Sequence, residues 1–117
     1  MQDPGIEDAI VLAAKAHKGQ RDRAGQPYIL HPMRVMLRLA DEPARIVAIL
    51  HDVVEDTATT MEDLRAACYT AEVLAALDCV TRRGEESYEE FIERIAPNAL
   101  ARRVKLADLA DNMDLTR

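Results

Sequence analysis

The sequence contains few of the residues that mark several common classes of protein. It has no tryptophan, four Phe and Tyr residues and four glycines among 117 residues, while 49% of the chain is apolar. The core must therefore be built from Leu, Ile, Val, Ala and Met, and an alanine-rich, glycine-poor chain favours an all-α fold. No apolar run approaches the roughly 20 residues that a membrane-spanning helix needs. We therefore expect no membrane association.

Signals of secretion and of cysteine chemistry are also missing. The N-terminal residues Met1–Gly5 have neither the basic nor the apolar region of a signal peptide. Cys68 and Cys79 have no CxxC spacing and no cysteine companions, which is typical of reduced thiols. We therefore expect a cytoplasmic protein. The length predicts one domain, residues 1–117, with a sizeable core.

The charge of the chain is negative but unevenly distributed. A net charge of −6 argues against a nucleic-acid-binding protein. From Lys15 to Arg38, six basic residues stand against one acid, whereas from Asp41 to Asp63 seven acids stand against one basic residue. A basic segment beside an acidic one suits a small polyanionic ligand bridged by a metal ion. The expected partner is therefore a small molecule, and the sequence makes no prediction of the oligomeric state.

Apolar residues at helical spacing predict a compact bundle of about six to seven helices. They cover approximately residues 5–18, 32–39, 42–54, 61–67, 71–82, 88–96 and 98–113. The segment 19–28 contains two glycines and a proline and is predicted to be a loop. Its positive charge makes it a candidate for anion contacts, with a solvated basic turn as the alternative.

The stretch LHDVVEDT, residues 50–57, concentrates side chains that can bind a metal or move a proton. If the helix continues through it, His51 and Glu55 lie one turn apart, as do Asp52 and Asp56. Burying these acids without a cation would be costly. The alternative is a helix that ends in solvated acids, but acids near a helix C-terminus oppose the macrodipole. We therefore interpret the stretch as part of a site.

Two other predicted helices supply further donors. His31 stands at the start of the second helix, and Asp108 interrupts the apolar stripe of the last one, where a buried acid needs a partner. Together with His51 and Asp52 they offer two imidazoles and two carboxylates, a set that suits Mn, Fe, Co or Zn without deciding between them. The alternative is a plain bundle with buried neutral histidines, which would leave both aspartates without partners.

This donor set predicts a reaction class. With a metal lowering the pKa of water, Glu55 and Asp56 would orient or deprotonate that water. Basic side chains of the 15–23 region would hold phosphate oxygens, and the candidates are Lys18, Arg21 and Arg23. The predicted reaction is hydrolysis at phosphorus.

Three ordered motifs resemble those of one enzyme family. The segments AHKGQRDRAGQPYILHP, LHDVVEDT and VKLADLADNM resemble the HD-domain phosphohydrolases, specifically the hydrolase domain of RelA/SpoT-type alarmone enzymes and the small alarmone hydrolases related to metazoan SpoT homologues. The resemblance runs from about Ala13 to Met113. It implies an HD-domain bundle that removes the 3′-pyrophosphate of ppGpp or pppGpp and yields GDP or GTP and pyrophosphate.

The resemblance also implies the roles of individual residues. The manganese ligands of that family correspond to His31, His51, Asp52 and Asp108. The catalytic pair that handles the water corresponds to Glu55 and Asp56, and a residue of the nucleotide pocket corresponds to Asn112. The expected cofactor is therefore Mn²⁺, although other divalent transition metals suit the same donors.

The chain departs from the family pattern at three places. Asp22, between Arg21 and Arg23, stands where many members have an arginine that packs against guanine. The LAD motif continues as Leu109–Asn112 instead of Arg, an apolar residue, His or Tyr, and Asn. Relatives usually add one or more helices beyond the position of Arg117, so we expect a less complete pocket wall and no synthetase activity.

These departures leave two alternatives to alarmone hydrolysis. One is an HD phosphohydrolase that acts on another nucleotide, which Asp22 favours because base recognition is then less secure. The other is a metal-binding module that binds an alarmone without turnover. The presence of both Glu55 and Asp56 argues against it, since a pure binding protein has no need of two uncompensated acids.

Overall fold

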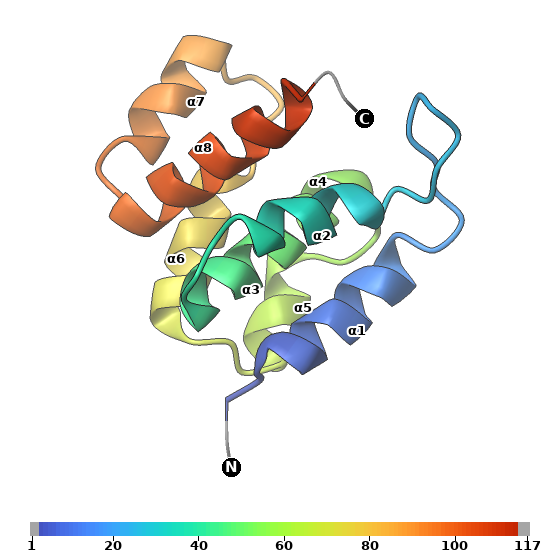
Figure 1. Ribbon diagram of the computed structural model, residues 1–117. Helices are drawn as coiled ribbons and strands as arrows, with labels where there is room; N and C mark the ends of the chain where they lie inside the picture. The colour runs from blue at the N-terminus through green and yellow to red at the C-terminus, as the bar shows by residue number, and fades with distance from the viewer. Residues whose placement is uncertain (1–2, 115–117) are drawn as a thin grey trace.

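The described part of the chain, residues 3–114 of this computed structural model, folds into helices joined by turns and one longer loop between α1 and α2 (Figure 1). They are α1 (Ile6–Ala16), α2 (Leu30–Leu37), α3 (Glu42–Leu50), α4 (Val53–Asp56), α5 (Met61–Ala66), α6 (Ala71–Val80), α7 (Tyr88–Ile95) and α8 (Ala99–Asn112). Within these residues the extended pairing is a single bridge between Arg21 and Pro27. The predicted all-α fold is therefore confirmed.

Polar caps fix where several helices begin. The cap side chains that accept a backbone N–H of the first turn are those of Asp41, Thr60, Thr70, Ser87 and Asn98. Each such cap stabilises its helix by about 1 kcal/mol. They explain why the start of α5 and of the three helices after it lies close to its predicted position.

The predicted continuous helix over residues 42–54 is interrupted. α3 ends at Leu50 and α4 begins at Val53, so that His51 and Asp52 form the turn between them. At this break the backbone N–H of His51 bonds to the carbonyl of Ala48, three residues back, in place of an α-helical bond. The break raises the number of helices in residues 3–114 to eight and lets two adjacent side chains reach the same site.

Helix α3 lies at the centre of the bundle. It packs against α1, α2, α6 and α8, and every residue from Ile46 to Leu50 is buried. The core is largely aliphatic, as expected, with Tyr69 and Phe91 as its aromatic members. No helix within residues 3–114 is long and apolar enough to cross a membrane.

The surroundings of α3 also position the residues described next. α2 and α8 contact one another on one side of it, and the loop of residues 17–29 projects from the bundle beside α2 (Figure 1). The α3–α4 turn therefore opens between α2, α8 and this loop.

Candidate metal centre

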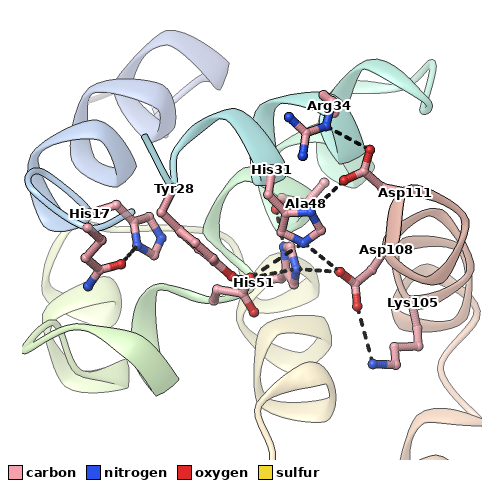
Figure 2. Close-up of polar contacts among 11 residues, drawn as sticks. His17, Tyr28, His31, Arg34, Ala48, His51, Lys105, Asp108 and Asp111 are labelled. Carbon is pink, nitrogen blue, oxygen red and sulfur yellow. Dashed lines mark hydrogen bonds and ion pairs between the residues drawn. The ribbon is translucent and has the colours of Figure 1, made fainter. Parts of the chain in front are cut away.

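Two imidazoles and a carboxylate from three separate segments meet in the interior (Figure 2). His31 comes from the first turn of α2, His51 from the α3–α4 turn and Asp108 from α8. Asp108 Oδ1 lies 2.9 Å from His31 Nε2 and 3.2 Å from His51 Nε2. One donor atom of each residue lies within 4.8 Å of the other two, and all three residues are buried. The arrangement can hold a metal ion.

The other nitrogen of each imidazole is fixed by a hydrogen bond. His51 Nδ1 donates to the carbonyl of Ala48 at 2.5 Å, and His31 Nδ1 donates to Asp111 Oδ2 at 2.7 Å. Both rings therefore turn Nε2 toward Asp108 (Figure 2). Histidines that bind metals are held in this way, since a carbonyl or carboxylate fixes the tautomer and the ring orientation.

The predicted fourth donor, Asp52, lies at the edge of this cluster. Its Oδ2 is 3.2 Å from His51 Nε2 and 3.8 Å from His31 Nε2, and it accepts a hydrogen bond from the hydroxyl of Tyr28. The structure therefore brings all four predicted donors together. The tightest group is nevertheless the one formed by the two histidines and Asp108.

The electrostatics of the cluster favour positive charge. Burial lowers the pKa of His51, but the carboxylates of Asp52 and Asp108 outweigh it and raise this pKa to about 10. For Asp108, burial alone would raise the pKa, but hydrogen bonds from His31 and His51 hold this pKa well below its usual range. Buried carboxylates need a nearby positive charge. A protonated imidazole can supply it, and so can a bound divalent metal ion.

Four residues around the cluster were not predicted from the sequence as members of the site. They are Tyr28, Arg34, Lys105 and Asp111. The side chain of Asp111 is 1% exposed and accepts a 3.0 Å bond from Arg34 Nε as well as the bond from His31. A signal was present, because Asp111 follows Asp108 by three residues and so lies on a neighbouring part of the α8 surface. Asp111 thus orients a candidate ligand from behind.

Lys105 supplies a second cation next to the cluster. It precedes Asp108 by three residues on α8, and its Nζ lies 3.3 Å from Asp108 Oδ2. Asp108 therefore faces the imidazoles with one oxygen and the lysine with the other (Figure 2).

The two acids of α4 diverge. Glu55 accepts a hydrogen bond from the backbone N–H of Arg82, whereas the backbone carbonyl of Asp56 accepts one from Gln20 Nε2 at 2.8 Å. Partial burial raises the pKa of both carboxyl groups, and nearby Asp52 adds to the effect on each. Of the pair, Glu55 lines a cavity beside the cluster, and Asp56 lines neither of the two cavities described below.

The third histidine, His17, lies outside the cluster. Its Nδ1 donates to Gln20 Oε1 at 2.8 Å, because the amide nitrogen of Gln20 is already directed at the carbonyl of Asp56. Its Nε2 is buried with no hydrogen-bond partner among the described residues, and its ring packs 5.0 Å from that of Tyr28. His17 and Gln20 therefore tie the end of α1 to α4, a link that the apolar stripe of α1 did not predict.

Two cavities adjoin the cluster. The larger, about 1060 Å³, lies under the α1–α2 loop and beside the C-terminal end of α8, and the smaller, about 200 Å³, lies between α4, the end of α6, α7 and α8. Of the predicted substrate-binding residues, the larger cavity is lined by Arg21, Arg23 and Asn112. Lys18 lines neither and lies in the exposed turn that follows α1.

Asp22 also lines the larger cavity, but its carboxylate is engaged locally. Its Oδ1 accepts the backbone N–H groups of Ala24 and Gln26 at 2.9 and 3.0 Å. Gly25, with φ of +82°, completes this tight turn in a conformation that favours glycine. Asp22 therefore shapes the loop that carries Arg21 and Arg23.

The sequence is similar to that of known proteins over nearly its whole length. Residues 9–111 match the profile of a family described as HD domain. The chain is 35% identical over 118 residues to a guanosine-3′,5′-bis(diphosphate) 3′-pyrophosphohydrolase of Aquifex aeolicus, covering 93% of this chain and 17% of the relative. It is 36% identical over 127 residues to a GTP pyrophosphokinase of Streptomyces coelicolor, covering 96% of this chain and 15% of the relative.

The fold is similar to that of a solved structure. That structure is described as a metazoan ortholog of SpoT that hydrolyzes ppGpp and plays a role in starvation responses. The two share a TM-score of 0.78 and 30% identity, covering 96% of this chain and 71% of the other. The curated relatives are much longer, since the chain spans 15% and 17% of the two described above.

Proposed function

The chain belongs to the HD-domain family, and on that premise we propose that it is a divalent-metal-dependent hydrolase that removes the 3′-pyrophosphate of ppGpp or pppGpp. One observation carries the proposal: His31, His51 and Asp108 converge in a buried cluster with both Nε2 atoms facing Asp108. The names of the relatives support the substrate class. The expected cytoplasmic location belongs to the same proposal.

The residues of the cluster fit a divalent transition metal. His31, His51 and Asp108 would hold it, with Asp52 as a fourth donor. Nitrogen and oxygen donors of this kind suit manganese, which we propose as the metal. A bound divalent ion would lower the pKa of water and polarise phosphoryl oxygens. Asp111 and the carbonyl of Ala48 keep the two imidazoles in the tautomer that this binding requires.

Glu55 is the better placed of the two acids to handle water. It lines the smaller cavity together with His51 and Asp108. Burial raises the pKa of its carboxyl group, toward the neutral range in which a general base is most efficient. The charge of Asp52 contributes to the raised pKa of Asp56, but Asp56 lines neither cavity. We therefore assign proton transfer to Glu55 and a supporting electrostatic role to Asp56.

The larger cavity would hold the nucleotide. Arg21, Arg23 and Arg34 line it and supply the positive charge that phosphate groups need. Asn112, at the end of α8, offers an amide that can bond to a base or a ribose. Lys18 lies outside the cavity and has no part in this proposal.

The test is release of pyrophosphate from ppGpp by the purified chain at a fixed concentration of free Mn²⁺. We expect turnover with ppGpp, little with deoxynucleoside triphosphates, and loss of turnover on chelation. The variant Glu55→Gln should bind ppGpp as the natural chain does but turn it over at least about 100-fold more slowly, since general-base catalysis contributes at least that much. Unchanged turnover in this variant would remove Glu55 from the mechanism.

A second candidate is hydrolysis of another nucleotide by the same centre. Asp22 favours it, because its carboxylate bonds to the loop backbone and offers no flat cationic surface to a guanine. Turnover of another nucleotide at a higher kcat/KM than ppGpp would select this reading. Binding of ppGpp without turnover would select the non-catalytic module.

A further inference from the structure

We propose that the two cavities divide the substrate, so that the larger one holds the nucleoside and the smaller one binds the pyrophosphate that is released, through Arg82 and Lys105. This inference rests on the function proposed above and names a binding site within it. The carrying observation is that the candidate metal centre forms the wall between the two cavities.

The lining residues define this wall. Asp52 and Asp108 line both cavities, His31 lines the larger and His51 lines the smaller. A phosphorus atom held at the cluster therefore stands at the junction, with space on either side. Ligand sites for molecules of nucleotide size occupy roughly 300–1000 Å³, so the larger cavity has room for a nucleoside and the smaller, at about 200 Å³, does not.

The stereochemistry of the reaction assigns a side to each participant. The water oxygen forms a bond to the phosphorus that carries the ribose 3′ oxygen, and the bond between that phosphorus and the 3′ oxygen breaks. The 3′ oxygen takes up a proton, a base accepts one from the water, and pyrophosphate keeps the water oxygen. Attacking and leaving oxygens lie roughly in line on opposite sides of phosphorus. With the nucleoside in the larger cavity, the attack must come from the smaller one.

The divergence of the two α4 acids agrees with this assignment. Glu55 lines the smaller cavity, on the side from which water must approach, while Asp56 lines neither cavity. The hydrogen bond from the backbone N–H of Arg82 holds the Glu55 carboxylate there. The same residue that fixes the base thus also lines the cavity, and its guanidinium lies against the ring of Tyr88, another lining residue.

Two cations line the smaller cavity. The ammonium of Lys105 lies 5.3 Å from the centre of the Phe91 ring and 3.3 Å from Asp108 Oδ2, with the side chain 19% exposed. The guanidinium of Arg82 lies 5.9 Å from the centre of the Tyr88 ring and donates to the carbonyl of Glu86 at 3.3 Å. Contacts with aromatic faces position both cations. The polar contact of the Arg82 guanidinium is with a neutral carbonyl, so its charge remains available to pyrophosphate. The ammonium of Lys105 already pairs with Asp108 and would be shared between that carboxylate and the same anion.

The experiment measures the binding of each product by calorimetry at a fixed concentration of free Mn²⁺. We expect pyrophosphate and GDP to bind together, so that saturation with one does not compete with the other. Arg82→Gln should raise the Kd of pyrophosphate roughly tenfold, the effect of losing one charge-assisted contact, and leave the Kd of GDP unchanged. Arg23→Gln should raise the Kd of GDP and leave the Kd of pyrophosphate unchanged.

The neighbouring Arg83 provides the matched control. It lines neither cavity, pairs with Asp78 at 3.5 Å and has a side chain that is 62% exposed, so Arg83→Gln should change neither Kd. Lys105→Gln repeats the test from α8 if Arg82→Gln disturbs the fold. Competition between the two products, or pyrophosphate binding that resists both Arg82→Gln and Lys105→Gln, would overturn the assignment. Failure of the enzymatic function appears separately, as absence of pyrophosphate release from ppGpp.

Discussion

The buried cluster and the α1–α2 loop, residues 17–29, are held in shape by different kinds of contact. In the cluster, His31 is held between Asp108 and Asp111, two residues of α8 that lie far from it in sequence. In the loop, the shape is set locally by Asp22 and Gly25, and the side chains of Arg21 and Arg23 are exposed. The proposed metal centre therefore depends on the packing of the whole bundle, whereas the placement of the two loop arginines depends on a short segment.

The strongest test of this comparison is removal of the proposed shared ligand by Asp108→Asn. The amide keeps the volume of the side chain but loses the charge that pairs with both imidazoles, so we expect metal affinity and turnover to fall by more than about 100-fold, beyond the loss typical of outer contacts. Metal analysis after dialysis and a pyrophosphate-release assay measure the two effects. Helical circular dichroism should stay unchanged, and retained metal would contradict the assignment.

The next test removes a contact behind the ligand, through Asp111→Asn. The imidazole of His31 loses the carboxylate that fixes its Nδ1 proton, and we expect metal affinity to fall about 10- to 100-fold. Turnover at saturating metal should recover most of its value, which separates an orienting residue from a ligand. A Mn²⁺ titration of turnover distinguishes the two cases. The control is Asp78→Asn, an exposed acid of α6 that pairs with Arg83 and lines neither cavity.

The pH dependence of metal binding tests the electrostatics of the cluster. In the metal-free protein the pKa of His51 is raised to about 10, so a metal must displace a proton from it at neutral pH. Apparent affinity should therefore rise with pH, about tenfold per unit between roughly pH 6 and 8 for one released proton. Because the pKa of His51 is higher in the folded metal-free protein than in the unfolded chain, protonation stabilises the fold. This stabilisation is complete at pH values below the pKa of the unfolded chain and is lost as the pH rises toward about 10. Affinity that is independent of pH would show that His51 is not a ligand.

Much of the cluster could be predicted from the sequence because its members stand in short motifs. His31, His51, Asp52 and Asp108 each interrupt an apolar run, and a buried polar group needs a partner. The break at residues 51–52 could not be predicted in this way. From Ile46 to Leu50 every residue is apolar and buried, so the pattern has no polar face that could show where the helix ends.

The divergence of Glu55 and Asp56 was beyond sequence reasoning for a different reason. The Glu55 carboxylate is held by the backbone N–H of Arg82, which lies 27 residues away in the chain. The role of Lys18 was assigned from charge alone. Charge in a loop does not determine which side chains line a cavity, and Lys18, in the turn after α1, is not among the residues that line the cavity of Arg21 and Arg23.

The smallest expected effects come from the loop and complete the comparison. Arg23→Gln removes one exposed cation from the larger cavity and should raise KM for ppGpp by about tenfold at most, since a solvent-accessible charge contact contributes modestly. Metal affinity and kcat should stay unchanged, because no residue of the cluster depends on the loop arginines. Lys18→Gln makes the same change of charge in the same loop, outside the cavity, and should leave KM within about twofold of the natural value. Equal effects of the two variants would mean that the loop acts through its overall charge, and a loss of metal affinity in either would mean that the loop and the cluster are one structural unit.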